Sequence, residues 1–247
     1  MPNSNQETET AIDVIGELLR INTEISELCV FEPRPVPLAQ TRLGGGAGIS
    51  AILKAGLKLR DDLGLPFWDS VLVSSLEAGA PAFPILEEAL FHNAPPHRVI
   101  PIARADWSRF PLTSIAAAGL SSRVLVLKSR LKMRSGEIRH IPMLDFHCSF
   151  SSQNRELASR VSTMMDSAGG YLLHSGRSFH FYGKSLMTEQ QLPSFLGRAL
   201  LLSPIVDRAW IAHQLIEGAC GLRITPKVDG ESEPHVIQEI EAVCGSS

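Results

Sequence analysis

The segment LHSGRSFHFYG, from Leu173 to Gly183, contains a Ser-Gly-Arg turn between two short apolar stretches. Serine and glycine are favoured in turns, so the segment predicts two strands joined at Ser175-Gly176. The turn brings a hydroxyl, backbone N–H groups and the Arg177 guanidinium close to the imidazole of His180. Charge-assisted and bidentate donors of this kind suit a polyphosphate ligand. An ordinary hairpin turn is the alternative interpretation of Ser175-Gly176, and it leaves the spacing of the Arg and the His unexplained.

Acidic residues follow apolar runs on both sides of this segment, at Asp145-Phe146-His147 and at Val206-Asp207. Carboxylate and imidazole side chains at strand ends are suited to hold a divalent metal against bound phosphates. Each position also has a simpler explanation. Asp145 could be a solvent-facing strand end, His147 a hydrogen-bonded core histidine, and Asp207 the N-cap of a helix.

The composition is that of a globular protein with a sizeable core. Of 247 residues, 44% are hydrophobic and 20% are charged, and the formal net charge is −3. This charge argues against strong non-specific nucleic-acid binding by the surface as a whole. Apolar runs are too short to span a membrane, and the polar start of the sequence predicts no secretory signal, so we expect a cytoplasmic protein. The four scattered cysteines contain no CxxC pair, which favours reduced thiols over a zinc site or disulfides.

The first part of the chain is predicted to be helical. Apolar residues recur at helical spacing over residues 8–28, and residues 48–92 predict three helices separated by Gly-Pro breaks. The glycine cluster at 44–48 lacks a following Lys-Ser/Thr pair, so we interpret it as a flexible joint rather than a phosphate loop. We therefore expect a helical extension over residues 1–95 and an α+β domain over residues 96–247.

Strands and helices are interleaved in the second part. The pattern predicts strands and helices as follows: strands at 98–104, 123–128, 138–147, 171–174, 179–182 and 222–225, and helices at 153–168, 189–202, 208–217 and, as a short one, near 236–243. Together they indicate the α+β class.

Basic residues alternate along one arm of a predicted hairpin that turns at Ser135-Gly136-Glu137. They are Lys128, Arg130, Lys132 and Arg134, with Arg139 on the return arm. Because side chains alternate between faces in a strand, these residues predict an electropositive face. It either contacts a nucleic-acid backbone or is a solvated outer face.

In order along the chain, the segments at Asp145-Phe146-His147, Ser175 to His180 and Asp207 resemble the three motifs of the archaeo-eukaryotic primase superfamily, which includes primase-polymerases. The resemblance covers roughly residues 98–226. It implies a mixed-sheet core with metal held by Asp145, His147 and Asp207, and a triphosphate held by nucleotide-binding residues. The latter are Ser175, Gly176, Arg177 and His180. Independently of the resemblance, Arg223 lies on an apolar strand, where it could reach phosphate as a further nucleotide-binding residue or could instead pair with Asp229 or Glu231.

Two positions depart from the family pattern. His147 occupies a position where the family usually has a carboxylate, and imidazole binds Mn better than Mg. Ser178 replaces a glycine, which narrows the approach of a ligand to the backbone.

Two functions remain open. One is template-dependent transfer of an NTP or dNTP to a primer or initiating nucleotide, with Mn or Mg as cofactor. The other is a degenerate nucleotide- and nucleic-acid-binding subunit of a multiprotein complex, such as one of a defence system. A single-stranded template or primer-template is the expected partner, and a protein partner is expected at the helical extension. A serine hydrolase is disfavoured because Ser175 lacks the Gly-x-Ser-x-Gly elbow. DNA or RNA specificity, NTP or dNTP preference, and oligomeric state are left open.

Overall fold

The computed structural model describes residues 8–33, 47–79, 83–90, 98–109, 124–226 and 232–243. These residues form two compact units. The larger unit contains residues 8–33 and the described residues from 98 onward, and the smaller unit contains residues 47–79 and 83–90. None of the helices in the described part of the chain is long and apolar enough to cross a lipid bilayer.

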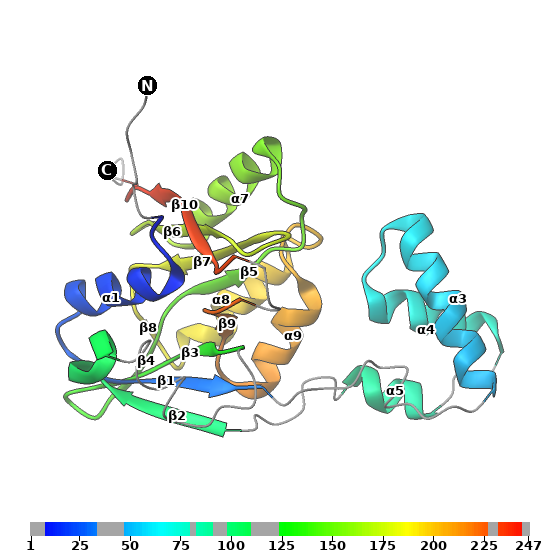
Figure 1. Cartoon of the computed structure of the whole chain (residues 1–247), viewed down its shortest axis with the longest axis horizontal. Helices are drawn as coiled ribbons and strands as arrows, with labels where there is room; N and C mark the ends of the chain where they lie inside the picture. The colour runs from blue at the N-terminus through cyan, green and yellow to red at the C-terminus, as the bar shows by residue number, and fades with distance from the viewer. Residues whose placement is uncertain are drawn as a thin grey trace. The chain divides into compact units, whose positions relative to one another are not determined.

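The larger unit is a mixed α+β structure with two antiparallel sheets (Figure 1). One sheet has the strand order β2-β1-β3-β4-β8, with β9 also paired to β3, and the other has the order β10-β6-β7-β5. The strands are β1 (Ile25–Glu32), β2 (Arg98–Ala103), β3 (Val126–Met133), β4 (Ile138–His140), β5 (Met143–Asp145), β6 (Gly170–His174), β7 (Phe179–Gly183), β8 (Met187–Thr188), β9 (Gly221–Arg223) and β10 (His235–Ile240). The predicted fold class is confirmed.

A single hydrophobic core contains side chains from both sheets and from the helices of the larger unit. In β3, Leu127, Ser129 and Leu131 are buried in alternation with more exposed basic residues, as expected for a strand with one face on the core. In β7, all the residues are buried. This strand therefore lies in the interior, and it can hold polar side chains such as His180 in a rigid environment.

The helices of the larger unit are α1 (Ala11–Ile21), α7 (Ser152–Met165), α8 (Gln191–Leu200) and α9 (Arg208–Glu217), with a 3₁₀ segment η1 (Arg104–Arg109). Local capping signals explain where several of them begin. Thr10 and Asp13 form a reciprocal capping box at α1. Ser151 accepts a hydrogen bond from the Asn154 N–H at α7. The predicted helices at 153–168, 189–202 and 208–217 are confirmed, with shorter limits for the first two.

The helix expected over residues 8–28 is only partly present. It ends at Ile21, and residues 25–32 form β1, which pairs with β2 and β3. Ile25 and Leu28 are buried in this sheet. Strand partners far along the chain thus override the local helical spacing. Consequently α1 and β1 lie in the larger unit. That the primase-like domain begins at residue 96 stays a prediction.

Two further expectations differ from the structure. The return arm at 138–147 is not one strand. It divides at Ile141-Pro142 into β4 and β5, which belong to different sheets. Near the C-terminus, the predicted short helix at 236–243 is wrong, because residues 235–240 form β10, which pairs antiparallel with β6. The strand at 221–223 is therefore not the last one.

The smaller unit consists, in its described part, of α3 (Ala47–Leu63), α4 (Phe67–Glu77) and α5 (Phe83–Leu90), so the three predicted helices are confirmed. Leu53, Val71 and Ile85 form its small core. Gly56 lies against Val71 so closely that an added Cβ would be 2.9 Å from the Val71 Cα. Of the predicted glycine joint, residues 44–46 lie outside the described residues, and Gly48 is part of α3.

Candidate functional site

Three of the predicted site residues meet at the end of β5. β5 and β7 are antiparallel neighbours with Asp145 opposite His180. Beyond β5, Phe146 forms an isolated bridge with Val206, and the Asp207 N–H donates to the Asp145 carbonyl at 2.9 Å. The backbone thus brings Asp145, His147 and Asp207 together from segments far apart in the sequence. Their clustering is a consequence of strand pairing rather than of sequence distance.

Asp207 caps helix α9. Its Oδ1 accepts hydrogen bonds from the N–H groups of Ala209 and Trp210, both at 2.9 Å. Its other oxygen, Oδ2, lies 3.8 Å from His147 Nδ1, and both side chains are about one-third exposed, at 32% and 39%. The helix-cap interpretation is therefore confirmed, and one carboxylate oxygen still faces the histidine. Because the two roles use different oxygens, they are compatible.

His180 is an almost fully buried imidazole beside Asp145. Its Nε2 lies 3.7 Å from Asp145 Oδ1, and its Nδ1 is buried with no hydrogen-bond partner among the described residues. Burial, assisted by the nearby Arg223 charge, lowers the pKa of His180 to about 3. The ring is therefore neutral near neutral pH, and its contact with Asp145 is not an ion pair. A hydrogen bond from a bound molecule would satisfy the orphan nitrogen.

The Ser-Gly-Arg turn is closed by a hydrogen bond from the Ser175 N–H to the Ser178 carbonyl at 3.0 Å. Gly176 has φ +105°, a conformation that favours glycine. Arg223, on β9, donates from Nη2 to the Ser175 carbonyl at 2.5 Å and from Nη1 to the Thr225 carbonyl. The alternative partners of Arg223, Asp229 and Glu231, lie outside the described residues. Arg223 thus fixes the turn and places a permanent positive charge beside it.

Ser178 has a role that the sequence did not reveal. Its hydroxyl lies 2.6 Å from the carbonyl oxygens of both Phe146 and Cys148. It therefore links the turn to the segment that contains His147. The only available signal was that Ser178 departs from the glycine of the family pattern; the structure gives that departure a structural purpose.

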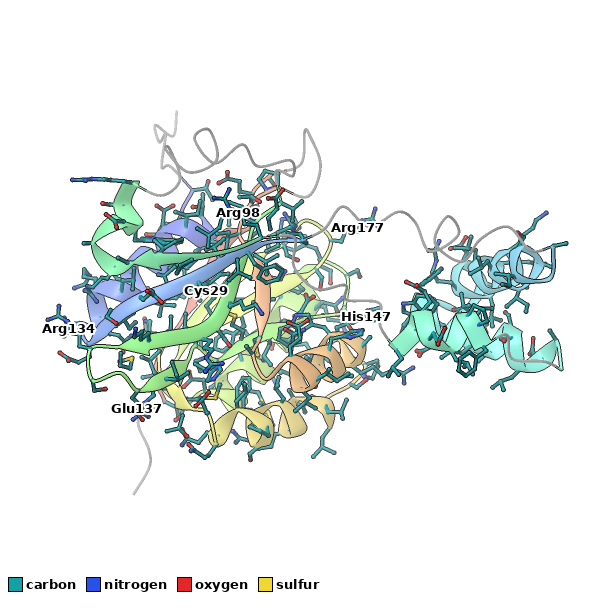
Figure 2. All side chains as sticks on the ribbon, turned by 90° about the horizontal axis from the view of Figure 1, so that it is seen from below. Cys29, Arg98, Arg134, Glu137, His147 and Arg177 are labelled. Atoms are coloured by element: carbon teal, nitrogen blue, oxygen red, sulfur yellow. The ribbon has the colours of Figure 1, made fainter. Side chains whose placement is uncertain are left out.

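The basic hairpin residues are not gathered at this site. Figure 2 shows Arg134 and Glu137 at one end of the larger unit, and Arg177 and His147 at the other. Three of the predicted nucleic-acid contacts also have acidic partners: Lys128 with Glu217 at 3.7 Å, Arg130 with Glu189 at 3.2 Å, and Arg139 with Glu137 at 2.9 Å. Lys132 and Arg134 are exposed. The electropositive face is thus partly neutralised within the protein.

The donor set fits a divalent metal in part. Within the described residues, no three His, Cys, Asp or Glu side chains form a ready-made ligand cluster. The side chains present are two partly exposed carboxylates, Asp145 and Asp207, and the imidazole of His147. Carboxylates suit Mg and Mn, while an imidazole favours Mn. A complete coordination shell requires oxygens from a bound substrate, as is common where a metal bridges protein and phosphate.

Comparison with known protein families agrees with this geometry. The family model described as AEP-like, archaeo-eukaryotic primase 1D-like, matches residues 112–236. This range contains every candidate residue discussed above and covers half of the chain. No curated protein and no solved structure matches the chain significantly. The chain therefore belongs to the AEP-like family of archaeo-eukaryotic primase 1D-like proteins.

Proposed function

We propose that this protein is a metal-dependent, template-directed nucleotidyltransferase that makes or extends a primer. An AEP-like domain indicates a primase- or polymerase-related nucleotidyltransferase that binds nucleic acid, and enzymes of this family use divalent metals. The observation that carries the proposal is the junction of β5, β7 and the start of α9. There, a hydrogen bond from Asp207 N to Asp145 O joins the two acidic residues, and the Ser178 hydroxyl links the Ser175–Ser178 turn to the carbonyls on either side of His147.

On the phosphate side, the residues of the turn hold the triphosphate of the incoming nucleotide. The exposed Arg177 supplies a guanidinium, Ser175 a hydroxyl, and the backbone at Gly176 an approach without a side chain. Neutral His180 contributes a hydrogen bond without adding charge. Arg223 stabilises the turn and adds positive potential from behind. A rigid clamp of this kind orients the reacting atoms, which accounts for much of the rate of phosphoryl transfer.

On the metal side, Asp145, His147 and Asp207 are the side chains that would hold a divalent ion. When held there, a divalent ion would lower the pKa of an attacking hydroxyl and would neutralise charge on the leaving pyrophosphate. The hydrogen bonds from Ala209 and Trp210 keep Asp207 in one orientation, with Oδ2 toward His147. Ser178 holds the segment that precedes and follows His147. These contacts preorganise the donors.

Nucleic-acid binding by the hairpin residues and protein binding by the helical region both remain proposals. Lys132 and Arg134 are the exposed members of the hairpin, and the surface ion pairs of Lys128, Arg130 and Arg139 are weak enough for phosphates to displace them. In the smaller unit, large apolar side chains are strongly exposed, which supports a protein partner: Leu63, Leu76 and Leu90.

A second function has two observations in its favour. His147 replaces a carboxylate, and the described residues contain no cluster of three ready-made ligands. A catalytically degenerate subunit would keep the phosphate turn and bind nucleotide or primer ends without turnover.

The test is nucleotide incorporation on primed and unprimed single-stranded templates, with Mg or Mn, by wild type, Asp145→Asn and His147→Asp. The proposal predicts metal-dependent products that Asp145→Asn abolishes, and a shift of preference toward Mg in His147→Asp. If no product forms but nucleoside triphosphate raises the melting temperature, and His180→Ala removes that effect, the protein is the binding subunit. Absence of both effects would reject both functions.

A further inference from the structure

Phe150 is an exposed aromatic side chain attached to the proposed phosphate turn. Its backbone N–H donates to the Arg177 carbonyl at 2.9 Å. Its side chain is 48% exposed although Phe is usually buried. Neither the sequence motifs nor the proposed catalytic residues account for it.

The ring of Phe150 packs against other aromatic side chains, which hold it rigidly in place. Its centroid lies 4.0 Å from that of His174 and 5.5 Å from that of Phe179. His174 in turn contacts His235 edge-to-face at 5.2 Å. These supporting residues form one row across three strands, with His235 opposite His174 and His174 opposite Phe179. Burial lowers the pKa of His174, which favours the uncharged form of this supporting ring. A half-exposed ring on a fixed base is suited to stack with a planar group.

A polar groove begins two residues after Phe150. It has a volume of about 470 Å³ and runs along α7, with residues Ser152, Arg155, Ser159 and Arg160 from the helix and Gln238 from β10. Gln238 donates to Ser159 at 3.0 Å, and Arg160 is paired with Glu156 at 2.6 Å. Arg155 has no ion pair within the described residues. Arg177, at the turn, likewise has no acidic partner among them.

Exposed aromatic rings flanked by unpaired cations are the arrangement with which proteins bind single-stranded nucleic acids. The bases stack on the rings, and the cations contact the backbone phosphates. Residues 128–139 of the basic hairpin contain no aromatic side chain, and the ring beneath Lys128 is the half-buried Phe31 of β1. Three cations of the hairpin are paired with glutamates. Its tip lies at the end of the larger unit opposite to Arg177 (Figure 2). The surface beside the turn is therefore better suited to hold a single strand at the catalytic residues.

We propose that a single-stranded nucleic acid enters the site over Phe150, with one base stacked on this ring and the adjoining phosphates bound by Arg155 in the α7 groove. The inference rests on the proposed function, since it concerns the strand that the nucleotidyltransferase would copy or extend. It assigns the part of the strand that lies at the catalytic residues to a surface formed by the start of α7, β10 and the turn, and it leaves the hairpin as a proposed contact for nucleic acid farther from the site.

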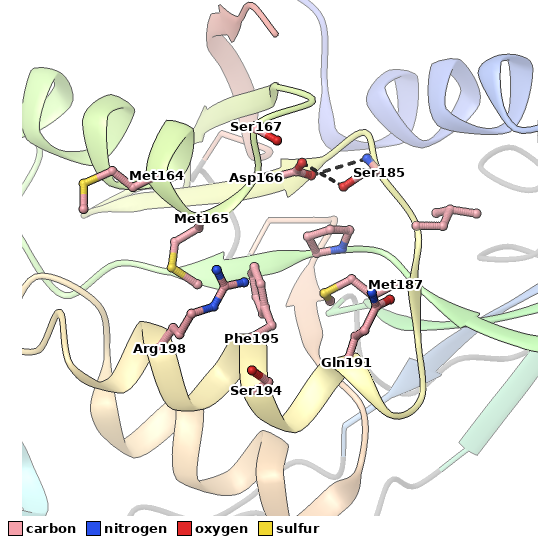
Figure 3. A pocket seen from close by; sticks show the side chains of 12 residues that line it. Met164, Met165, Asp166, Ser167, Ser185, Met187, Gln191, Ser194, Phe195 and Arg198 are labelled. Carbon is pink, nitrogen blue, oxygen red and sulfur yellow. Dashed lines mark hydrogen bonds between the residues drawn. The ribbon is translucent and has the colours of Figure 1, made fainter. Parts of the chain in front are cut away.

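The experiment measures binding of a fluorescein-labelled oligothymidylate of about 12 nucleotides, within the site sizes of ~4–16 nucleotides common for single-strand binding modules. Fluorescence anisotropy is recorded at several salt concentrations for wild type, Phe150→Leu, Phe150→Trp and Arg155→Gln. Two matched controls are Phe83→Leu, on α5, and Arg198→Gln. Phe83 is 69% exposed. Arg198 is exposed and lines a separate pocket of about 510 Å³ between α7 and α8 (Figure 3). Melting curves are recorded for each variant to check that it is folded.

The inference predicts that Phe150→Leu weakens binding about 5- to 150-fold, the equivalent of ~1–3 kcal/mol for one stacked base, with an unchanged salt dependence. Phe150→Trp retains affinity. Arg155→Gln lowers the slope of log K against log[salt] by about 0.7 for one lost phosphate contact. Both controls bind like wild type.

Binding that is absent in wild type, or equal in Phe150→Leu and Phe83→Leu, overturns the inference. Nucleoside triphosphate binding is followed in parallel by thermal shift. If wild type binds nucleotide but fails these oligonucleotide criteria, the proposed function stands while the inference fails. If Phe150→Leu weakens nucleotide binding alone, the ring contacts the incoming base and the strand assignment is wrong. If wild type binds neither the oligonucleotide nor the nucleoside triphosphate, both the inference and the proposed function are rejected.

Discussion

Asp207 has a structural and a proposed catalytic role, and two substitutions separate them. Oδ1 caps α9 through two hydrogen bonds, while Oδ2 faces His147. Asparagine caps helices about as well as aspartate, whereas alanine cannot. Asp207→Asn therefore keeps the cap and removes the negative charge, and Asp207→Ala removes both. Stability and activity should respond differently to the two variants.

The expected loss of stability follows from the loss of the α9 helix cap. Replacing a capping Asp with Ala costs ~0.5–2 kcal/mol, typically ~1. For a chain of this size, ~1 kcal/mol lowers the melting temperature by about 2–4 °C. Asp207→Asn loses only the interaction of the charge with the helix N-terminus, ~0.3–1 kcal/mol. We therefore expect Asp207→Ala to melt a few degrees below wild type and Asp207→Asn to melt between them, while both variants lose metal-dependent nucleotide incorporation.

The assay combines calorimetric melting with nucleotide incorporation over a range of Mn and Mg concentrations. Thr10→Ala is the control, because the Thr10 side chain caps α1 through hydrogen bonds with Asp13, while it is the Thr10 backbone that pairs with His235. It should lower stability by a similar amount without loss of incorporation. Retained incorporation and unchanged metal dependence in Asp207→Asn would refute the metal role and leave Asp207 as a helix cap.

Three further predictions concern stability, two of them at the site and one in the smaller unit. Ser178→Ala removes the hydroxyl that contacts the Phe146 and Cys148 carbonyls, so the free energy of unfolding in urea should fall by ~0.5–1.5 kcal/mol; an unchanged midpoint would contradict this. Because the pKa of His180 is lowered from 6.5 to about 3 in the folded state, the unfolded chain binds the proton more readily between these values. Stability should therefore fall as the pH decreases through this window, and a His180→Gln variant should show a flatter pH profile; equal slopes would argue against a buried neutral imidazole. In α3, Gly56→Ala places a Cβ 2.9 Å from the Val71 Cα and should lower the stability of the smaller unit by ~1–3 kcal/mol in thermal melts followed by circular dichroism, whereas Gly48→Ala, with no neighbour within 4 Å, should not.

The sequence predicted the elements whose signals are local. Asp207 caps α9, and the Ser175–Ser178 turn joins β6 and β7, because caps and turns depend on a few adjacent residues. β1 and β10 were missed as strands because their formation depends on partners far along the chain, β2 and β3 in one case and β6 in the other. The division of the return arm at Pro142 did have a local signal, since proline is disfavoured within a strand. That the chain enters the second sheet there depends on the pairing of β5 with β7.

The same distinction between local signals and long-range pairing applies to the residues of the candidate site. The motifs identified Asp145, His147, His180 and Asp207, and the structure brings these residues together through the register of β5 with β7 and the Phe146–Val206 bridge. Sequence spacing could not show that Asp145 lies opposite His180, since the pairing requires both strands to be neighbours. The side-chain link made by Ser178 and the platform at Phe150 depend on loop geometry, which no residue pattern specifies.

The proposed activity is the addition of the nucleotide that a template base dictates. The most direct measurement uses four single-stranded templates that differ only at the position to be copied. Each is supplied with one labelled nucleotide at a time and with Mn or Mg. We expect incorporation of the complementary nucleotide in each case, and loss of all products in Asp145→Asn. Incorporation that is independent of the template base, or that persists in Asp145→Asn, would contradict the account.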